Sequence, residues 1–271
     1  MRKRHPIAAL FFAATIFALA VAAARPQTAP APLNIPAGFD LGFAMNALYG
    51  NYDPAAGTST WTAPLSGLEN TNFQAGQKVN VKAFFAAADP STGEVFLATF
   101  AVPAEGEFDC HACAPLIGAA MFERAGTTWK MEASERPDII FGQYGNPATA
   151  QLFQVGPSHS GIQLSDTDGG QGVADSHVIF LVSWNGGFSQ AYSGIVASNN
   201  SDYCGAQAGS PCYAYRSDLK FVKGDNPDYY DLTIETSGTN LPSSGTGAIE
   251  KMSGTEHLHL VGGKYVAANS N

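Results

Sequence analysis

The chain has 271 residues, of which 45% are hydrophobic, so it can bury a full-sized core and does not have the composition of a disordered polymer. Only 14% are charged, and the 29 glycines and 16 prolines exceed the usual share of turn-forming residues. The formal net charge of −9 argues against a nucleic-acid partner, because binding the phosphate backbone needs a basic face. The composition also excludes a coiled coil, a collagen and a multi-span membrane protein.

The N-terminus has the three parts of a secretory signal peptide. Basic residues at positions 2–4 precede an apolar run over residues 7–24, which ends in three alanines before Arg25. We therefore predict that residues 1–24 are removed on export to the periplasm or the extracellular space, leaving no membrane span. A run of this length would also suit an uncleaved anchor. Residues 25–37 hold four prolines and little to bury, which predicts an extended Pro/Ala-rich tether.

Beyond residue 37, β-favouring runs recur and helical patterns are rare. Residues 79–84 alternate apolar and polar side chains, the pattern of a strand with one buried face. Further short runs rich in Val, Ile, Phe, Thr and Tyr are separated by turn-forming residues and cover residues 94–102, 119–122, 128–133, 150–155, 177–184, 193–197, 218–222, 229–235 and 257–260. Helix is expected only near residues 39–48 and 66–70. These patterns predict an all-β fold of antiparallel, sandwich-like sheets.

Three places carry hairpin signals. Asn185-Gly186 lies between apolar flanks, and Asn-Gly is the strongest short hairpin signal. Residues 124–129 and 261–265 each place a Gly turn between an apolar strand and an aromatic residue. We expect the sheets to form two packed units, residues 38–135 and 136–271 with a boundary near residues 135–142, or one large continuous domain.

The cysteines indicate disulfides. The chain has four, and an even number in an exported protein is typical of bridges. Three pairings are open, and loop closure favours the two local ones because short loops cost least to close. These local pairs are Cys110 with Cys113 in the first unit and Cys204 with Cys212 in the second.

Cys110-His111-Ala112-Cys113 is the most unusual string of the chain. It does not match a c-type haem site, because Ala114 stands where the haem-site histidine would follow the second cysteine. A structural bridge that ties a tight loop is the favoured interpretation. The alternatives are an interaction loop formed by Asp109 and His111, a redox-active C-x-x-C pair, and a metal site.

The surroundings of this string resemble a family of uncharacterised exported bacterial proteins. These carry a Cys-His-Ala-Cys-Ala-Pro segment, here residues 110–115, then an apolar Gly-Ala-Ala-x-Phe strand, here residues 118–122, and a Trp. An Asn-Pro-x-Tyr-Tyr-Asp-Leu segment at residues 226–232 fits the same family. The resemblance covers most of residues 70–235 and implies export, without implying an activity.

A second, narrower resemblance concerns the same loop. The periplasmic Ivy-type lysozyme inhibitors present a histidine on a disulfide-closed loop that plugs the catalytic cleft of a cationic enzyme. His111 between Cys110 and Cys113, on an acidic chain, is similar to a shorter version of that loop. The resemblance does not extend beyond the loop, and it implies a cationic cell-wall hydrolase as partner.

Other candidate sites are weaker. Asp166 and Asp168 resemble the start of a calcium loop, but the glutamate that completes an EF-hand is missing and a Gly-rich turn is favoured. His257 and His259 would share one face of a strand, where a solvated polar face explains them as well as a metal does. Ser158, His159 and Asp166 could form a triad only if the fold brings them together.

The sequence therefore predicts an exported, disulfide-containing β protein with a non-catalytic binding or structural role in the cell envelope. Its partner would be a protein or a saccharide, and exposed aromatic residues would suit either. No catalytic residue, metal ligand or cofactor is assigned, calcium being the one cofactor that the sequence suggests. The alternatives are a thiol–disulfide or hydrolytic enzyme and an inhibitor that acts through His111.

Overall fold

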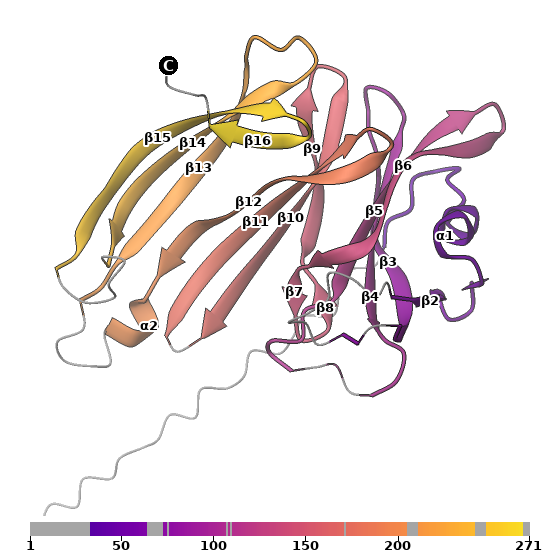
Figure 1. Ribbon diagram of the computed structural model, residues 1–271, viewed down its shortest axis with the longest axis horizontal. Coiled ribbons are helices and arrows are strands. Elements are labelled where there is room, and N and C mark those ends of the chain that lie inside the picture. Colours follow the sequence, from indigo (N-terminus) through magenta and orange to yellow (C-terminus); the bar gives the residue numbers. More distant parts are fainter. Residues whose placement is uncertain are drawn as a thin grey trace, which may run out of the picture. The chain divides into compact units, whose positions relative to one another are not determined.

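A computed structural model describes residues 33–63, 73–74, 76–106, 108, 110–170, 172–204, 211–241 and 248–267 (Figure 1). The predicted signal peptide, the tether up to residue 32, the helix expected at residues 66–70 and Asp109 lie outside the described residues. None of the described helices is long and apolar enough to cross a membrane.

Among the described residues, nearly all regular structure is antiparallel β-sheet, which confirms the predicted fold class. The first sheet has the order β1 (Tyr52–Asp53), β2 (Thr58–Thr62), β3 (Lys78–Ala88), β4 (Val95–Pro103), β5 (Leu116–Ala125), β6 (Thr128–Ile140). The second sheet runs from β16 back to β9 and comprises β9 (Thr149–Gly156), β10 (His159–Gly170), β11 (Val173–Trp184), β12 (Gly187–Asn199), β13 (Ala214–Lys223), β14 (Tyr230–Asn240), β15 (Glu250–Val261) and β16 (Lys264–Ala267). A small hairpin of β7 (Gly142–Gln143) and β8 (Asn146–Pro147) connects the two sheets.

Local turn chemistry explains the hairpins. Asn185 and Gly186 connect β11 to β12 with φ angles of 51° and 77°, the left-handed pair that a two-residue type I′ turn requires. Gly262 and Gly263 connect β15 to β16 in the same way, with φ angles of 60° and 79°. Gly126 has a φ of 64° at the β5–β6 turn. All three predicted hairpins are confirmed.

Strand β10 lies outside the runs predicted as strands, as do β1, β2, β7 and β8. The Gly-rich turn expected at residues 166–170 is wrong, because these residues form the end of β10 and pair with β11 up to the Gly170–Val173 pair. Asp166 to Gly170 contains no large apolar side chain, so neither alternation nor β-propensity marks it as a strand. The sheet forms there through backbone hydrogen bonds to β11.

Helix α1 (Leu41–Tyr49) falls within the helix predicted at residues 39–48 except for its last residue. The Asp40 carboxylate caps its first turn by accepting from the Phe43 N–H at 2.9 Å. Gly50, with a φ of 68°, ends it. Helix α2 (Ser201–Cys204) is a single turn after β12.

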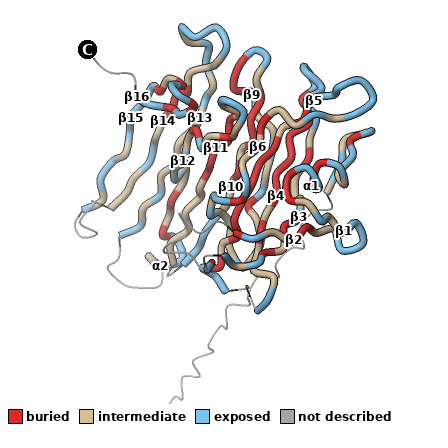
Figure 2. Tube along the Cα trace, turned by 45° about the vertical axis from the view of Figure 1, so that its right-hand side comes forward, coloured by how far each residue is buried: buried red, intermediate tan, exposed pale blue. Residues whose placement is uncertain are grey.

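The described elements stack in layers. Helix α1 packs on one face of the first sheet around Met45, Leu48 and Phe122. The opposite face packs on β10–β12, where Phe96 and Ile117 meet Ile162, Leu164, Ile179 and Leu181. The other face of β9–β12 packs on β13–β16 around Phe180, Leu232, Ile234, Leu258 and Leu260. Strands β4, β5 and β11 are therefore covered on both faces, and Figure 2 shows long buried stretches in the middle of the molecule.

Asp89 links two of these layers. It is buried at the turn after β3 and accepts hydrogen bonds from the Ser91 N–H at 2.7 Å and the Ser91 hydroxyl at 2.6 Å. Burial alone would raise the pKa of Asp89, but the hydrogen bonds from Ser160 of β10, from Ser91 and from the Thr92 N–H outweigh it and hold that pKa below its ordinary value. The carboxylate thus stays ionised while fastening the first sheet to the second.

The chain passes from the first sheet to the second between Ile140 and Thr149, close to the predicted unit boundary. The two sheets nevertheless share the core formed by Phe96, Ile117 and the inner residues of β10 and β11. All described residues fall in one compact unit. The division into two units stays a prediction, and the shared core leads us to expect that both sheets unfold together.

Candidate functional site

The disulfides take the local pairing, Cys110 with Cys113 and Cys204 with Cys212. Cys110 lies in an exposed turn, whereas Cys113 is only 7% exposed, just before β5. The Gly145 N–H donates to the Cys113 carbonyl at 2.7 Å, which anchors this end of the loop to the β7–β8 turn.

The structure brings together two motifs that the sequence marked separately. His111 Nε2 lies 2.8 Å from Asp168 Oδ1 at the end of β10. The His111 ring also packs against Tyr144 of the β7–β8 turn, with ring centroids 5.1 Å apart. The two side chains of the ion pair are 42% and 54% exposed, so the contact lies at the surface. The disulfide-closed loop is therefore docked on the second sheet.

This docking leaves the calcium hypothesis without geometric support. Asp168 contacts His111, and the Asp166 carboxylate accepts from Gln143 Nε2 at 3.4 Å. Within the described part of the chain, no group of three or more His, Cys, Asp or Glu residues is placed to hold a metal ion.

A groove opens in the second sheet between β12 and β13. Among the described residues, these strands form three register pairs, from Ala197 with Arg216 to Asn199 with Ala214. Beyond the Ala197 pair the two strands diverge (Figure 1). The groove has a volume of about 650 Å³ and extends under β13 to the inner face of β9–β11. It lies within the size range of small-ligand sites.

The closed end of the groove is held by buried Asn200. Its side-chain amide donates to the Pro211 carbonyl at 2.9 Å, and its side-chain oxygen accepts from the Tyr213 N–H at 2.8 Å. The Cys204–Cys212 disulfide closes the same β12–β13 connection. This second bridge therefore positions the strands where the groove begins, a role that the sequence did not indicate.

Most polar side chains on the inner wall of the groove are uncharged, namely Thr149, Gln163, Ser165, Thr167, Ser176 and Ser217. Asp166 and His177, which are register partners on β10 and β11, also line it. The uncharged side chains already form short hydrogen bonds among themselves, such as Gln163 Nε2 to Ser165 Oγ at 3.0 Å and Thr167 to Ser176 at 3.1 Å. A hydroxyl has one donor and two acceptor positions, so one such bond leaves capacity for a ligand. Phe180 and Phe221 add two rings with centroids 5.2 Å apart.

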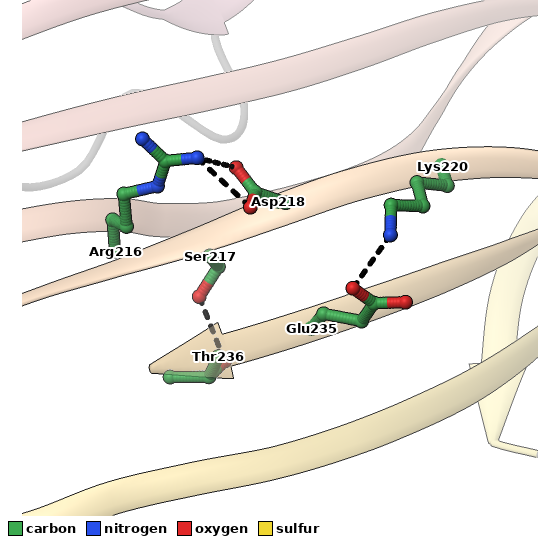
Figure 3. Close-up of polar contacts among 6 residues, drawn as sticks. All are labelled: Arg216, Ser217, Asp218, Lys220, Glu235 and Thr236. Carbon is green, nitrogen blue, oxygen red and sulfur yellow. Dashed lines mark hydrogen bonds and ion pairs between the residues drawn. The ribbon is translucent and has the colours of Figure 1, made fainter. Parts of the chain in front are cut away.

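Charges on β13 are paired. Figure 3 shows Arg216 with Asp218 and Lys220 with Glu235, both at 2.6 Å, beside the Ser217–Thr236 hydroxyl pair at 2.8 Å. Asp218 and Lys220 also line the groove at its β13 side. Because each is matched by an opposite charge, this rim does not select strongly for an ionic ligand.

A second cleft of about 550 Å³ lies between β6 and β11–β12 and contains Glu135, Asp138, His177, Gln190 and Ser193. Burial raises the pKa of Glu135, and the nearby charge of Asp138 adds to that rise. Burial also raises the pKa of Asp138. Neither carboxylate was singled out from the sequence, because scattered acids give no local sign that the fold will pair them.

These raised pKa values predict a pH-dependent stability. A carboxyl whose folded-state pKa is raised favours folding while it is protonated, and loses that contribution as the pH rises through the folded-state pKa. Asp138→Asn is therefore expected to raise the free energy of unfolding at pH 7 by a few tenths of a kcal/mol, on the order of 0.5, because Asp138 is exposed and solvent screens its charge. The gain should shrink towards pH 3, where the parent carboxyl is protonated.

The measurement is urea denaturation of parent and variant across this pH range. Asp225→Asn, an identical charge change at an exposed residue between β13 and β14, is the control. A variant less stable than the parent at pH 7, or one that follows the control at every pH, would contradict the prediction.

Other sequence candidates are separated or already engaged. His159 begins β10 and Asp166 lies seven residues later in the same strand, about 23 Å away, so the triad with Ser158 is wrong.

His257 and His259 do share the outer face of β15. His257 contacts Thr233 at 3.2 Å, and His259 contacts Asp231 at 2.9 Å. Strand β15 pairs with β14 on one side and with β16 on the other.

No family model, curated protein or solved structure matches this chain.

Proposed function

We propose that the chain is an exported binding protein that holds an uncharged saccharide in the groove between β12 and β13. The observation that carries the proposal is the lining of that groove, in which hydroxyl and amide groups lie around the partly exposed Phe221 ring, which itself packs on buried Phe180. Saccharides present many hydroxyls and apolar C–H faces. Such ligands need several convergent hydrogen-bonding groups together with an apolar surface.

Export is supported by the cysteines. All four are oxidised in two bridges, and bridges persist in oxidising compartments outside the cytoplasm. The predicted signal peptide and the resemblance to exported bacterial proteins point the same way. The periplasm or the extracellular space is therefore the proposed location.

The geometry of the groove favours a binding role over hydrolysis. Its hydroxyls bond to one another or to backbone, as in Thr149 Oγ1 to the Ser165 carbonyl at 2.8 Å. The two carboxylates with raised pKa values lie in the other cleft, between β6 and β11–β12. A sugar bound beside Phe221 thus meets mainly hydroxyl and amide groups, and of the titratable side chains in the groove Asp166 already accepts from Gln143 and Asp218 is paired with Arg216.

The inhibitor alternative has less geometric support. A histidine that plugs an enzyme cleft must present a free ring edge, whereas His111 Nε2 is bonded to Asp168 and its ring packs on Tyr144. That hypothesis stays a prediction. Unchanged lysozyme kinetics at high concentrations of this protein would end it.

The test of saccharide binding is NMR titration of the exported chain with chitotriose, cellotriose, maltotriose and xylotriose, each up to about 10 mM. At least one trisaccharide should give saturable shifts that map to β10, β11 and β13. Gln163→Leu keeps the side-chain size and removes the amide, so affinity should fall about tenfold or more. Thr255→Val, on the exposed face of β15, should bind as the parent does.

Absence of saturable shifts with all four sugars would overturn the proposal. So would shifts that map away from the groove, or undiminished binding by Gln163→Leu. If an extended peptide, rather than a sugar, shifts the β12 and β13 amides, the groove is a strand-addition site and the saccharide assignment is wrong.

A further inference from the structure

We propose that the Cys110–Cys113 bridge is a redox-active disulfide that accepts two electrons from dithiols of peptides or proteins. This activity is independent of saccharide binding in the groove. It rests on how the two cysteines differ in exposure, on what holds the loop between them, and on the contrast with the other bridge.

The two sulfurs belong to residues in different environments. Cys110 begins the exposed run Cys110, His111 and Ala112, whereas Cys113 is 7% exposed and precedes the fully buried Leu116 of β5. The Cys113 N–H donates to the Cys110 carbonyl at 2.9 Å, which closes the turn. An incoming thiolate can therefore reach Cys110, while Cys113 is the protected sulfur that leaves and later returns.

His111 lies between the cysteines and is held in place. The Asp168 carboxylate at 2.8 Å and the Tyr144 ring at 5.1 Å contact it from β10 and from the β7–β8 turn. His111 directly follows Cys110 in the chain, and positive charge on its imidazole would favour the thiolate that forms on Cys110. Asp168 is the carboxylate that contacts His111, and its register partner on β11 is Asp175.

A substrate thiolate attacks Cys110 Sγ, a mixed disulfide forms, and the Cys110–Cys113 bond breaks with Cys113 leaving as a thiolate. The second substrate thiolate attacks the substrate sulfur of the mixed disulfide and expels the Cys110 thiolate. The substrate gains a disulfide and loses two electrons and two protons, and the Cys110–Cys113 pair is reduced to the dithiol. A small-molecule disulfide, such as glutathione disulfide, restores the bridge by the reverse exchange.

The Cys204–Cys212 bridge provides an internal comparison. It closes the β12–β13 connection next to buried Asn200, which bonds to Pro211 and Tyr213 on the Cys212 side. Cys212 is exposed and Cys204 half-buried, so exposure alone does not separate the two bridges. The second bridge differs in its sequence separation of eight and in enclosing no histidine. We therefore expect it to be structural and to stay oxidised while Cys110–Cys113 exchanges.

The test uses the intact exported chain in mixtures of reduced glutathione and glutathione disulfide, quenched with acid, alkylated and mapped by peptide mass. Cys110–Cys113 should exchange at least about tenfold faster than Cys204–Cys212 in the same molecules. Cys113→Ala should take up glutathione on Cys110. Cys110→Ala should take it up on Cys113 about tenfold more slowly or worse.

His111→Ala should slow the exchange, and His257→Ala, on the outer face of β15, should leave it unchanged. A reduced synthetic peptide with two cysteines should be oxidised by the chain with glutathione disulfide supplied for turnover. Equal rates at the two bridges, resistance of both, or preferential adduct formation on Cys113 would overturn the proposal. The exchange rates of the two bridges in the parent protein test the proposal even if a variant fails to fold. Saccharide binding by Cys110→Ala is measured separately and tests the groove alone.

Discussion

Replacing Phe96 by alanine is expected to lower the free energy of unfolding by about 3–5 kcal/mol, in one transition that both sheets share. Phe96 is fully buried on the face of β4 that meets the second sheet, and its ring contacts Phe188 of β12 edge-on, with centroids 6.4 Å apart. Truncation removes the ring and leaves a cavity at the junction of the two sheets. A cavity there weakens both, because the residues around it come from both.

Urea denaturation followed by tryptophan fluorescence measures the effect. Trp61 in β2 and Trp129 in β6 report on the first sheet, and Trp184 in β11 reports on the second. A Trp184→Phe background and a Trp61→Phe/Trp129→Phe background therefore separate the two signals. Phe43→Ala, at a ring that is 42% exposed on α1, is the control and should cost about 1 kcal/mol or less. Two separate transitions, with only the first shifted by Phe96→Ala, would show that the sheets are independent units.

The same arrangement explains what the sequence could predict of the fold. Hairpin turns follow from one or two residues, as at Asn185-Gly186, so local chemistry suffices. The stacking of layers does not have a local signature. Residues 178–182 are consecutively buried because β11 is covered on both faces, and such a run does not show the alternation that identifies a sandwich strand.

The candidate sites were predictable only in pieces. His111 and Asp168 each stood out, but their contact depends on the register of β10 and on the position of the β7–β8 turn. No short sequence pattern marks the groove, because the groove arises where β12 stops pairing with β13. Asn200 holds the closed end of the groove. In the sequence it is one of several polar residues in a turn-like stretch, and only its hydrogen bonds to Pro211 and Tyr213 distinguish it.

Gly118→Ala is expected to cost about 2–3 kcal/mol of stability, because a methyl group has no room there. A Cβ atom on Gly118 would lie 2.9 Å from both the Tyr49 hydroxyl and Thr99 Oγ1, and 3.0 Å from the Glu135 carbonyl. Tyr49 and Thr99 are joined by a buried hydrogen bond of 2.6 Å that ties α1 to β4. Burial raises the pKa of Tyr49 well above its ordinary value, so the hydroxyl stays neutral. If the Tyr49 side chain moved to make room for a methyl group, its hydrogen bond to Thr99 would be lost.

Chemical denaturation of Gly118→Ala beside Gly254→Ala measures this cost. Gly254 lies in β15 with nothing within 4 Å of an added Cβ, so its replacement should change stability by less than about 1 kcal/mol. Tyr49→Phe removes one of the three crowding atoms, and in that background Gly118→Ala should cost less than it does alone. Equal costs in both backgrounds would mean that the crowding against Tyr49 is not what excludes a side chain.

The Gly118 prediction also gives a physical reason for the small residues after the disulfide loop. Gly118 makes room for the hydroxyl pair on the α1 side of β5, and Ala119 and Ala120 are buried on its two faces. Cys113 lies just before this strand, so the protected sulfur of the bridge is next to residues 116–120, which are all buried. Loosening β5 through Gly118→Ala should therefore speed reduction of Cys110–Cys113 while leaving Cys204–Cys212 unchanged, because the second bridge is held by Asn200 in the other sheet.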